Sequence, residues 1–100
     1  MITGSLCRAA RALVEINRAR LAEKTGVDAK AIELFERGID VPDSAVAAAL
    51  QTTLEDLGAV FLPETASQGV GVRLKFSRSI TERIANLESE GGPIASDDVP

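Results

Sequence analysis

The spacing of apolar and turn-forming residues between positions 18 and 38 constrains the fold of this 100-residue chain more than any other feature. Asn17 is a favourable N-cap for a short helix that buries Leu21. The triplet Thr25-Gly26-Val27 then turns the chain, because glycine adopts a positive φ without steric cost. A second helix follows at once, so the two helices must lie close together.

Asp28 is expected to cap this second helix, and Gly38 is placed where a glycine commonly follows a helix end. Its apolar side chains recur at helical spacing, which predicts a buried stripe of Ala31, Ile32 and Phe35. The same spacing leaves an opposite face free for a partner. That face consists of Ala29, Lys30, Glu33, Leu34 and Arg37.

Hydrophobic periodicity predicts three more helices. One runs from Ser5 to Val14, and another begins at Asp43 or Ser44 and ends at Leu50. Thr52 and Glu55 have the spacing of a capping box, which predicts a separate short helix ending at Gly58. The stripe of the helix that ends at Leu50 consists of Val46, Ala49 and Leu50. Residues 1–58 are therefore expected to form a five-helix domain.

Beyond Gly58 the apolar period changes to two. Alternation over residues 70–76 predicts a strand, and residues 60–62 provide its partner, so residues 59–76 form a β-hairpin. A two-stranded hairpin is marginal alone in water, so it needs packing on a helix or pairing with the same element of a second chain, and we favour the pairing. Residues 77–100 are expected to form a C-terminal helix and an acidic tail. The predicted dimerisation residues are Val60, Leu62, Val70, Val72, Leu74, Phe76, Ile80, Ile84 and Leu87.

The sequence contains three stretches in this order: LAEKTGV, AIELFERG and GVRLKF. From about Leu6 to Phe76 the chain resembles the Cro/cI-type (Xre-like) helix-turn-helix transcriptional regulators. The resemblance implies a mainly α, lambda-repressor-like DNA-binding domain followed by a hairpin. It also implies an ion pair between Arg11 and Glu36, which would link the first helix to the third.

In such regulators the two short helices contact DNA, the second one in the major groove. The resemblance assigns these contacts to Arg18, Ala29, Lys30 and Leu34, with Glu33 beside them. Lys30 suits guanine acceptors and Leu34 suits a thymine methyl, whereas Glu33 repels phosphate. Few side chains on this face can therefore recognise bases. The candidate phosphate contacts are Arg8, Arg18, Arg20, Lys24 and Arg37.

Charge is segregated along the chain, although its net value is −4. Residues 1–38 carry seven Lys or Arg against five Asp or Glu, whereas residues 39–100 carry four against ten. Phosphate contacts act within a Debye length of about 8 Å, so a local positive face suffices for DNA. The acidic half should face away from the duplex.

Composition argues against a disulfide-bonded, zinc-binding, catalytic or membrane-spanning protein. The single Cys7 has no disulfide partner and is interpreted as an apolar filler, and the absence of histidine leaves no zinc constellation. Glu33 and Glu36 lack a pocket or nucleophile, so we expect neither catalysis nor a cofactor. No apolar run approaches the roughly 20 residues that cross a bilayer, which predicts a cytoplasmic protein without membrane contact.

These patterns predict a sequence-specific regulator of transcription, expected to be a repressor, that binds double-stranded DNA as a homodimer on a near-palindromic operator. The alternative is a protein-interaction module, such as an antitoxin or phage-type adaptor, that engages a second protein through residues 77–100. If deleting those residues leaves dimerisation and DNA binding intact, they serve another partner.

Overall fold

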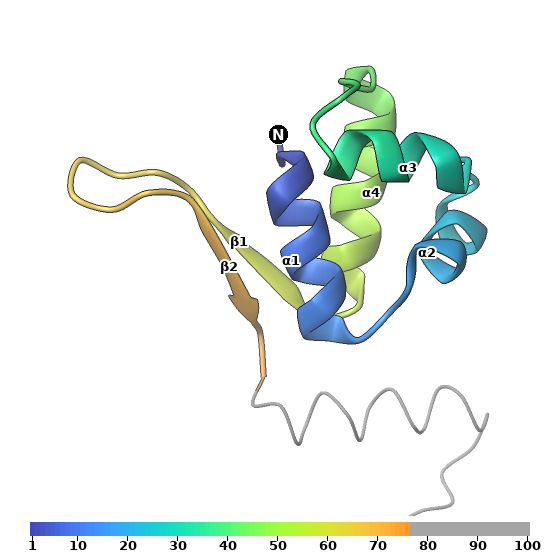
Figure 1. Cartoon of the computed structure of the whole chain (residues 1–100). Helices are drawn as coiled ribbons and strands as arrows, with labels where there is room; N and C mark the ends of the chain where they lie inside the picture. Colours follow the sequence, from blue (N-terminus) through green and yellow to red (C-terminus); the bar gives the residue numbers. More distant parts are fainter. Residues whose placement is uncertain (77–100) are drawn as a thin grey trace, which may run out of the picture.

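Helices form where the sequence supplies caps and apolar stripes. The side chains of Thr3, Asn17 and Asp43 each accept a hydrogen bond from the backbone N–H three residues later, which satisfies a donor that the first helical turn leaves free. The computed structural model describes residues 1–76. Its elements, labelled in Figure 1, are α1 (Gly4–Val14), α2 (Arg18–Thr25), α3 (Ala29–Glu36), α4 (Ser44–Asp56), β1 (Ala59–Leu62) and β2 (Gly71–Leu74).

The tight turn between α2 and α3 forms as predicted. Gly26 has a φ of 77° and its N–H donates to the carbonyl of Ala22, which closes α2. Gly38 has a φ of 75° just beyond α3. The two helices pack against each other and against the rest of the helical domain, so α2, the turn at Gly26 and α3 form one helix-turn-helix unit.

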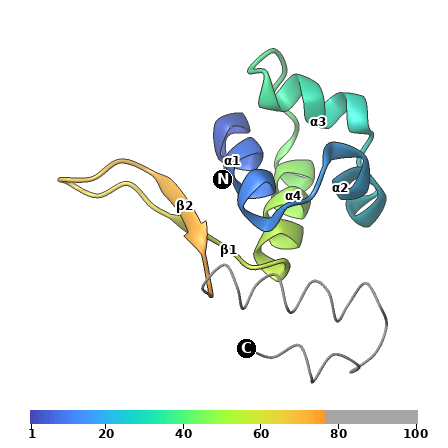
Figure 2. The ribbon, with the colours of Figure 1, turned by 60° about the horizontal axis from the view of Figure 1, so that its bottom comes forward.

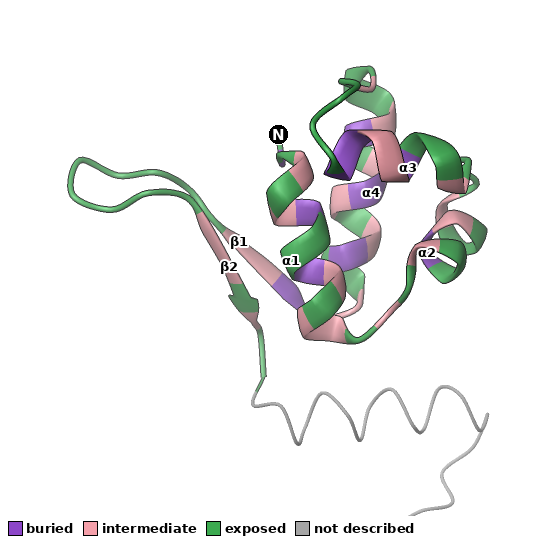
Figure 3. Cartoon of the chain, viewed as in Figure 1, coloured by how far each residue is buried: buried purple, intermediate pink, exposed green. Residues whose placement is uncertain are grey.

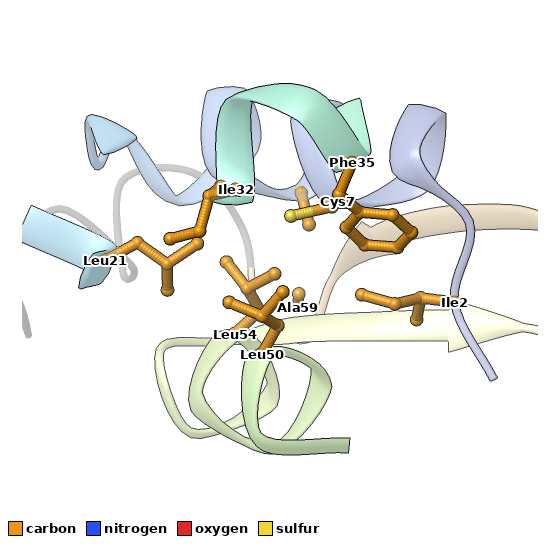
Figure 4. Packing of buried hydrophobic residues seen from close by; sticks show 9 residues of the cluster. Ile2, Cys7, Leu21, Ile32, Phe35, Leu50, Leu54 and Ala59 are labelled. Atoms are coloured by element: carbon orange, nitrogen blue, oxygen red, sulfur yellow. The ribbon is translucent and has the colours of Figure 1, made fainter. Parts of the chain in front are cut away.

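The core is aliphatic and lies between the helices (Figure 3). Figure 4 shows how side chains from every helix converge on it. Leu21, Ile32, Leu50 and Leu54 are its largest fully buried members beside the smaller Cys7. Burying one such Leu or Ile side chain contributes roughly 1.5 to 3 kcal/mol. The position of α3 therefore depends mainly on Ile32, together with Phe35.

The prediction of five helices is wrong, because the described residues contain four. The expected break at Thr52 does not occur, and α4 continues to Asp56. Leu50 and Leu54 are one helical turn apart and both fully buried, so an unbroken helix keeps them on one face of the core. This packing outweighs the capping-box spacing. Gln51 instead donates a side-chain hydrogen bond to Glu55.

Two buried stripes also differ from the prediction. In α3 the side chains of Ile32 and Phe35 are buried, but Ala31 is exposed. In α4 the buried residues include Ala47, whereas Ala49 is only half-buried. In both helices the large side chains determine which face is buried, and an alanine is buried only where it lies on that face. The predicted C-terminal helix, with Ile80, Ile84 and Leu87, lies outside the described residues.

The predicted hairpin is present as an antiparallel pair in which Phe61 lies opposite Val72. Its second strand is shorter than the alternation suggested, since β2 covers only Gly71–Leu74, whereas β1 begins one residue before the predicted 60–62. Both strands pack against α1, and β1 also contacts α4. In Figures 1 and 2 the loop of the hairpin projects away from the helices, on the side of α1 opposite to α2. The helix-turn-helix and the hairpin thus occupy opposite ends of the molecule.

One glycine is required by a close approach between two backbones. Gly4 begins α1 where that helix passes the end of α3, and a Cβ there would overlap the carbonyl oxygen of Phe35. The obstacle is main chain, which cannot rotate aside as a side chain can. No local sequence pattern indicates this contact, because it joins positions far apart in the chain.

We predict that Gly4→Ala lowers the free energy of unfolding by about 1 to 3 kcal/mol, the usual cost of overpacking a core contact. Urea denaturation measures this change. Gly69→Ala is the matched control, because a Cβ on Gly69 meets no described atom within 4 Å. Equal stability of the two variants would contradict the close contact between α1 and α3.

Candidate nucleic-acid interface

The face of α3 that points away from the core contains the residues predicted to contact DNA. The Lys30 side chain is 65% exposed and Arg37 is 55% exposed. Ala29 and Leu34 are half-buried, so each still presents part of its surface. Neither Lys30 nor Leu34 is enclosed within the chain, and α3 can therefore offer this face to a partner.

Glu33 partly neutralises the same face. Its carboxylate oxygens lie 3.5 Å from Lys30 Nζ and 3.5 Å from Arg37 Nη1. These ion pairs span one helical turn and are exposed, so each contributes only a few tenths of a kcal/mol. A phosphate or a base edge can displace them at small cost.

Asp28 occupies the N-cap position of α3 but does not cap it as predicted. Its side chain makes no capping hydrogen bond, although its carbonyl accepts from Ile32. The first backbone N–H groups of α3 therefore point outward without a side-chain acceptor. Such groups, together with the helix dipole, favour a bound anion.

Glu36 is the buried acidic residue at the opposite end of α3. Its side chain is 1% exposed and accepts two hydrogen bonds of 2.7 Å from Arg11, from Nε and from Nη2. This bidentate geometry is the strongest that a guanidinium and a carboxylate adopt. The structure thus brings together the two residues that the family resemblance pairs.

Two further donors reach the same carboxylate. Arg18 Nε donates to Glu36 Oε1 at 3.0 Å, and the Cys7 thiol donates to Oε2 at 3.3 Å. From the sequence, Arg18 was expected to contact only DNA and Cys7 to have no polar role. Cys7 and Arg11 are one turn apart on α1, and this spacing is the only signal in the sequence that the two side chains could contact the same residue.

This arrangement shifts the pKa values of its members. Burial alone would raise the pKa of Glu36, but the hydrogen bonds from Arg11, Arg18 and Cys7 outweigh burial and lower it below its ordinary value. Its hydrogen bond to Glu36 raises the pKa of Arg11. Burial, followed by the bond to Glu36, raises the pKa of Cys7 to about 12. The thiol therefore stays protonated and serves as a donor.

Arg18 remains partly available to an external ligand. Its side chain is 37% exposed, and the contact with Glu36 uses Nε. The other predicted phosphate contacts are also on the surface: Arg20 pairs with Glu23 at 3.3 Å, and Arg8 and Lys24 are exposed. Arg8 lies on α1 and therefore does not belong to the two helices that contain the other predicted phosphate contacts.

The predicted dimerisation residues that the structure describes all lie on the hairpin. Leu62, Val70 and Phe76 are 39%, 54% and 43% exposed. Val60, Val72 and Leu74 are half-buried. The hairpin thus keeps an apolar surface that the helices do not cover.

Comparison with family models and with curated proteins finds no match to this chain. Between residues 1 and 76 no helix is long and apolar enough to span a membrane, and no cluster of side chains there could hold a metal ion. The proposed second partner of residues 77–100 concerns a segment outside the described residues and stays a prediction.

We predict that Arg11→Ala lowers the free energy of unfolding by about 3 to 5 kcal/mol, because it leaves the buried Glu36 carboxylate with fewer donors. Arg20→Ala is the control, since its ion pair with Glu23 is exposed and should be worth less than about 1 kcal/mol. Urea denaturation of both variants provides the comparison. Similar losses in the two variants would show that Glu36 does not depend on Arg11.

The lowered pKa of Glu36 also predicts a pH dependence. The ionised side chain stabilises the fold above the pKa of the unfolded chain, about 4.3, and this stabilisation disappears as the pH falls through the folded value. Glu36→Gln should therefore flatten the fall in unfolding free energy between about pH 5 and pH 3. The exposed Glu23→Gln is the control and should retain the fall; an unchanged slope in Glu36→Gln would contradict this assignment.

Proposed function

We propose that this chain is a sequence-specific double-stranded DNA-binding regulator of transcription, acting as a repressor through a homodimer. The observation that carries the proposal is the placement of α3: Ile32 and Phe35 hold one side in the core, and Lys30 projects from the other. A helix with one anchored side and one exposed basic side can enter a major groove.

Phosphate contacts would position α3 at the groove. The uncapped N–H groups at the start of α3 and the partly exposed Arg18 at the start of α2 suit anionic oxygens. Glu36 holds Arg18 through Nε, so the ends of its guanidinium can point outward without free rotation of the side chain. Such contacts determine orientation and register on DNA, while bases determine sequence preference.

Base recognition would depend on few residues. Lys30 can donate to guanine, and Leu34 can contact a thymine methyl. Weak recognition by a single α3 makes two copies necessary: two such helices about 34 Å apart would occupy successive major grooves of a near-palindromic operator. Occupancy of that site would block or guide polymerase. We place this activity in the cytoplasm.

The test is binding to DNA from upstream of the chain's own coding region, compared with a shuffled duplex, over a range of salt concentrations. Bound phosphates release counterions, so affinity should fall steeply with salt, and the upstream duplex should be preferred. Lys30→Ala should weaken specific binding by about 5- to 150-fold, which corresponds to roughly 1 to 3 kcal/mol, and reduce the preference for the upstream duplex.

Lys75→Gln is the charge-matched control, because Lys75 is exposed just beyond β2 and belongs to neither α2 nor α3. Its specific affinity should stay close to that of the parent. Leu34→Ala should lower the sequence preference with little change in salt dependence. Equal affinity for both duplexes in the parent protein, with no loss in high salt, would refute DNA binding.

A further inference from the structure

The outer edge of β2 has backbone groups that point away from β1. Lys75 N–H donates to the carbonyl of Gly58 at 2.7 Å, and hydrogen-bonded pairs alternate along an antiparallel ladder. With the observed register, Arg73 and Gly71 therefore face β1 through their backbone groups, whereas Val72 and Leu74 direct theirs outward. No described residue's backbone pairs with that edge.

A side-chain contact supports this orientation. The Leu74 carbonyl accepts a hydrogen bond of 3.1 Å from Nη1 of the neighbouring Arg73. This carbonyl therefore does not pair with β1 and is occupied by an exposed, adjustable side chain. Another strand could replace that contact at little cost.

The opposite edge of the hairpin is poorly suited to pairing. In β1 the outward backbone groups belong to Ala59 and Phe61, and the next outward position is Pro63. Proline has no N–H and is a common device for protecting a strand edge. The corresponding positions along β2 are Val70, Val72 and Leu74, which favour strand pairing.

We propose that two copies of this chain associate by antiparallel pairing of their β2 edges around Val72, which produces a continuous four-stranded sheet. This register places Arg73 opposite Gly71 of the second copy, and Leu74 opposite Val70. Centring the pair further along β2 would set Arg73 against Arg73 or Lys75, and like charges directly opposite are unfavourable. Centring it on Gly71 would set Leu74 against the polar Gln68.

An apolar groove beside β1 and Val70 fits the same arrangement. It encloses about 180 Å³ between the start of α1, α4 and the hairpin, and its lining includes Ile2, Leu6, Phe61 and Val70. Pairing around Val72 brings Phe76 of the second copy alongside Gln68 and Val70, at the edge of this groove. Phe76, 43% exposed in the single chain, would thereby be covered.

This inference rests on the proposed function only in that a dimeric regulator needs such an interface, and the pairing can be tested without DNA. The probes are Gly71→Cys and Arg73→Cys in the full chain. A Cβ on Gly71 meets only the Leu62 side chain, at 3.8 Å, and Arg73 is exposed, so both variants should fold. The native Cys7 is fully buried and should not react.

Oxidation of the two variants mixed in equal amounts should give a disulfide-linked heterodimer of position 71 with position 73. Directly opposed, non-hydrogen-bonded pairs have Cα atoms about 4.5 Å apart, within the range of a disulfide. Each variant alone should link at least tenfold more slowly, because its own two cysteines would be diagonal neighbours. The parent protein should sediment as a dimer, and Val70→Pro should shift it toward the monomer.

Faster linkage of Arg73→Cys or Gly71→Cys to itself would overturn the proposed register. A monomeric parent that gives no mixed disulfide would overturn the pairing altogether, including the case in which residues 77–100 cover the edge. The DNA-binding test is separate, because a monomer with salt-sensitive, sequence-dependent binding would retain the proposed function while this interface failed.

Discussion

The buried carboxylate of Glu36 is the interaction on which the helical domain depends. It collects donors from α1 and from the start of α2, while it belongs to the end of α3. A buried charge of this kind adds little net stability, because desolvation offsets the attraction, but removing a partner is costly. Its main consequence is geometric. Arg11 and Arg18 reach one carboxylate only when the three helices adopt one arrangement, so the orientation of α3 relative to α2 follows from it.

The same cluster joins the core to the surface. Cys7 donates from within the apolar core, and its raised pKa keeps the proton needed for that bond. Arg18 approaches from the surface and remains partly exposed. A structural residue and a candidate DNA contact thus share an acceptor. For the proposed function, this means that the position of Arg18 depends on a residue that DNA would not touch.

Local features of this fold could be predicted from the sequence, whereas features that depend on tertiary contacts could not. The cap at Asn17, the turn at Gly26 and the hairpin periodicity each depend on neighbouring residues. The false helix break at Thr52 arose because the capping-box pattern is local, while the burial of Leu50 with Leu54 that overrides it is not. The close approach at Gly4 and the hydrogen bond of Cys7 could not be predicted for a related reason: each joins α1 to α3, about thirty positions away. For the candidate site, periodicity predicted the exposed face of α3, but it did not predict the hydrogen bond from Arg18 to Glu36.

The partly neutralised charge on α3 and the apolar edge of the hairpin both fit a dimer with two weak binding sites. Glu33 holds Lys30 and Arg37 in exposed ion pairs, which limits the attraction of a single α3 for phosphate. A weak single site gains useful affinity when a second one is linked to it, since the second contact then forms at a high effective concentration. The hairpin lies on the side of α1 away from α2, so an interface there would leave both helix-turn-helix faces uncovered. Weak half-sites would also favour correct operators, because a duplex that matches only one half retains little binding.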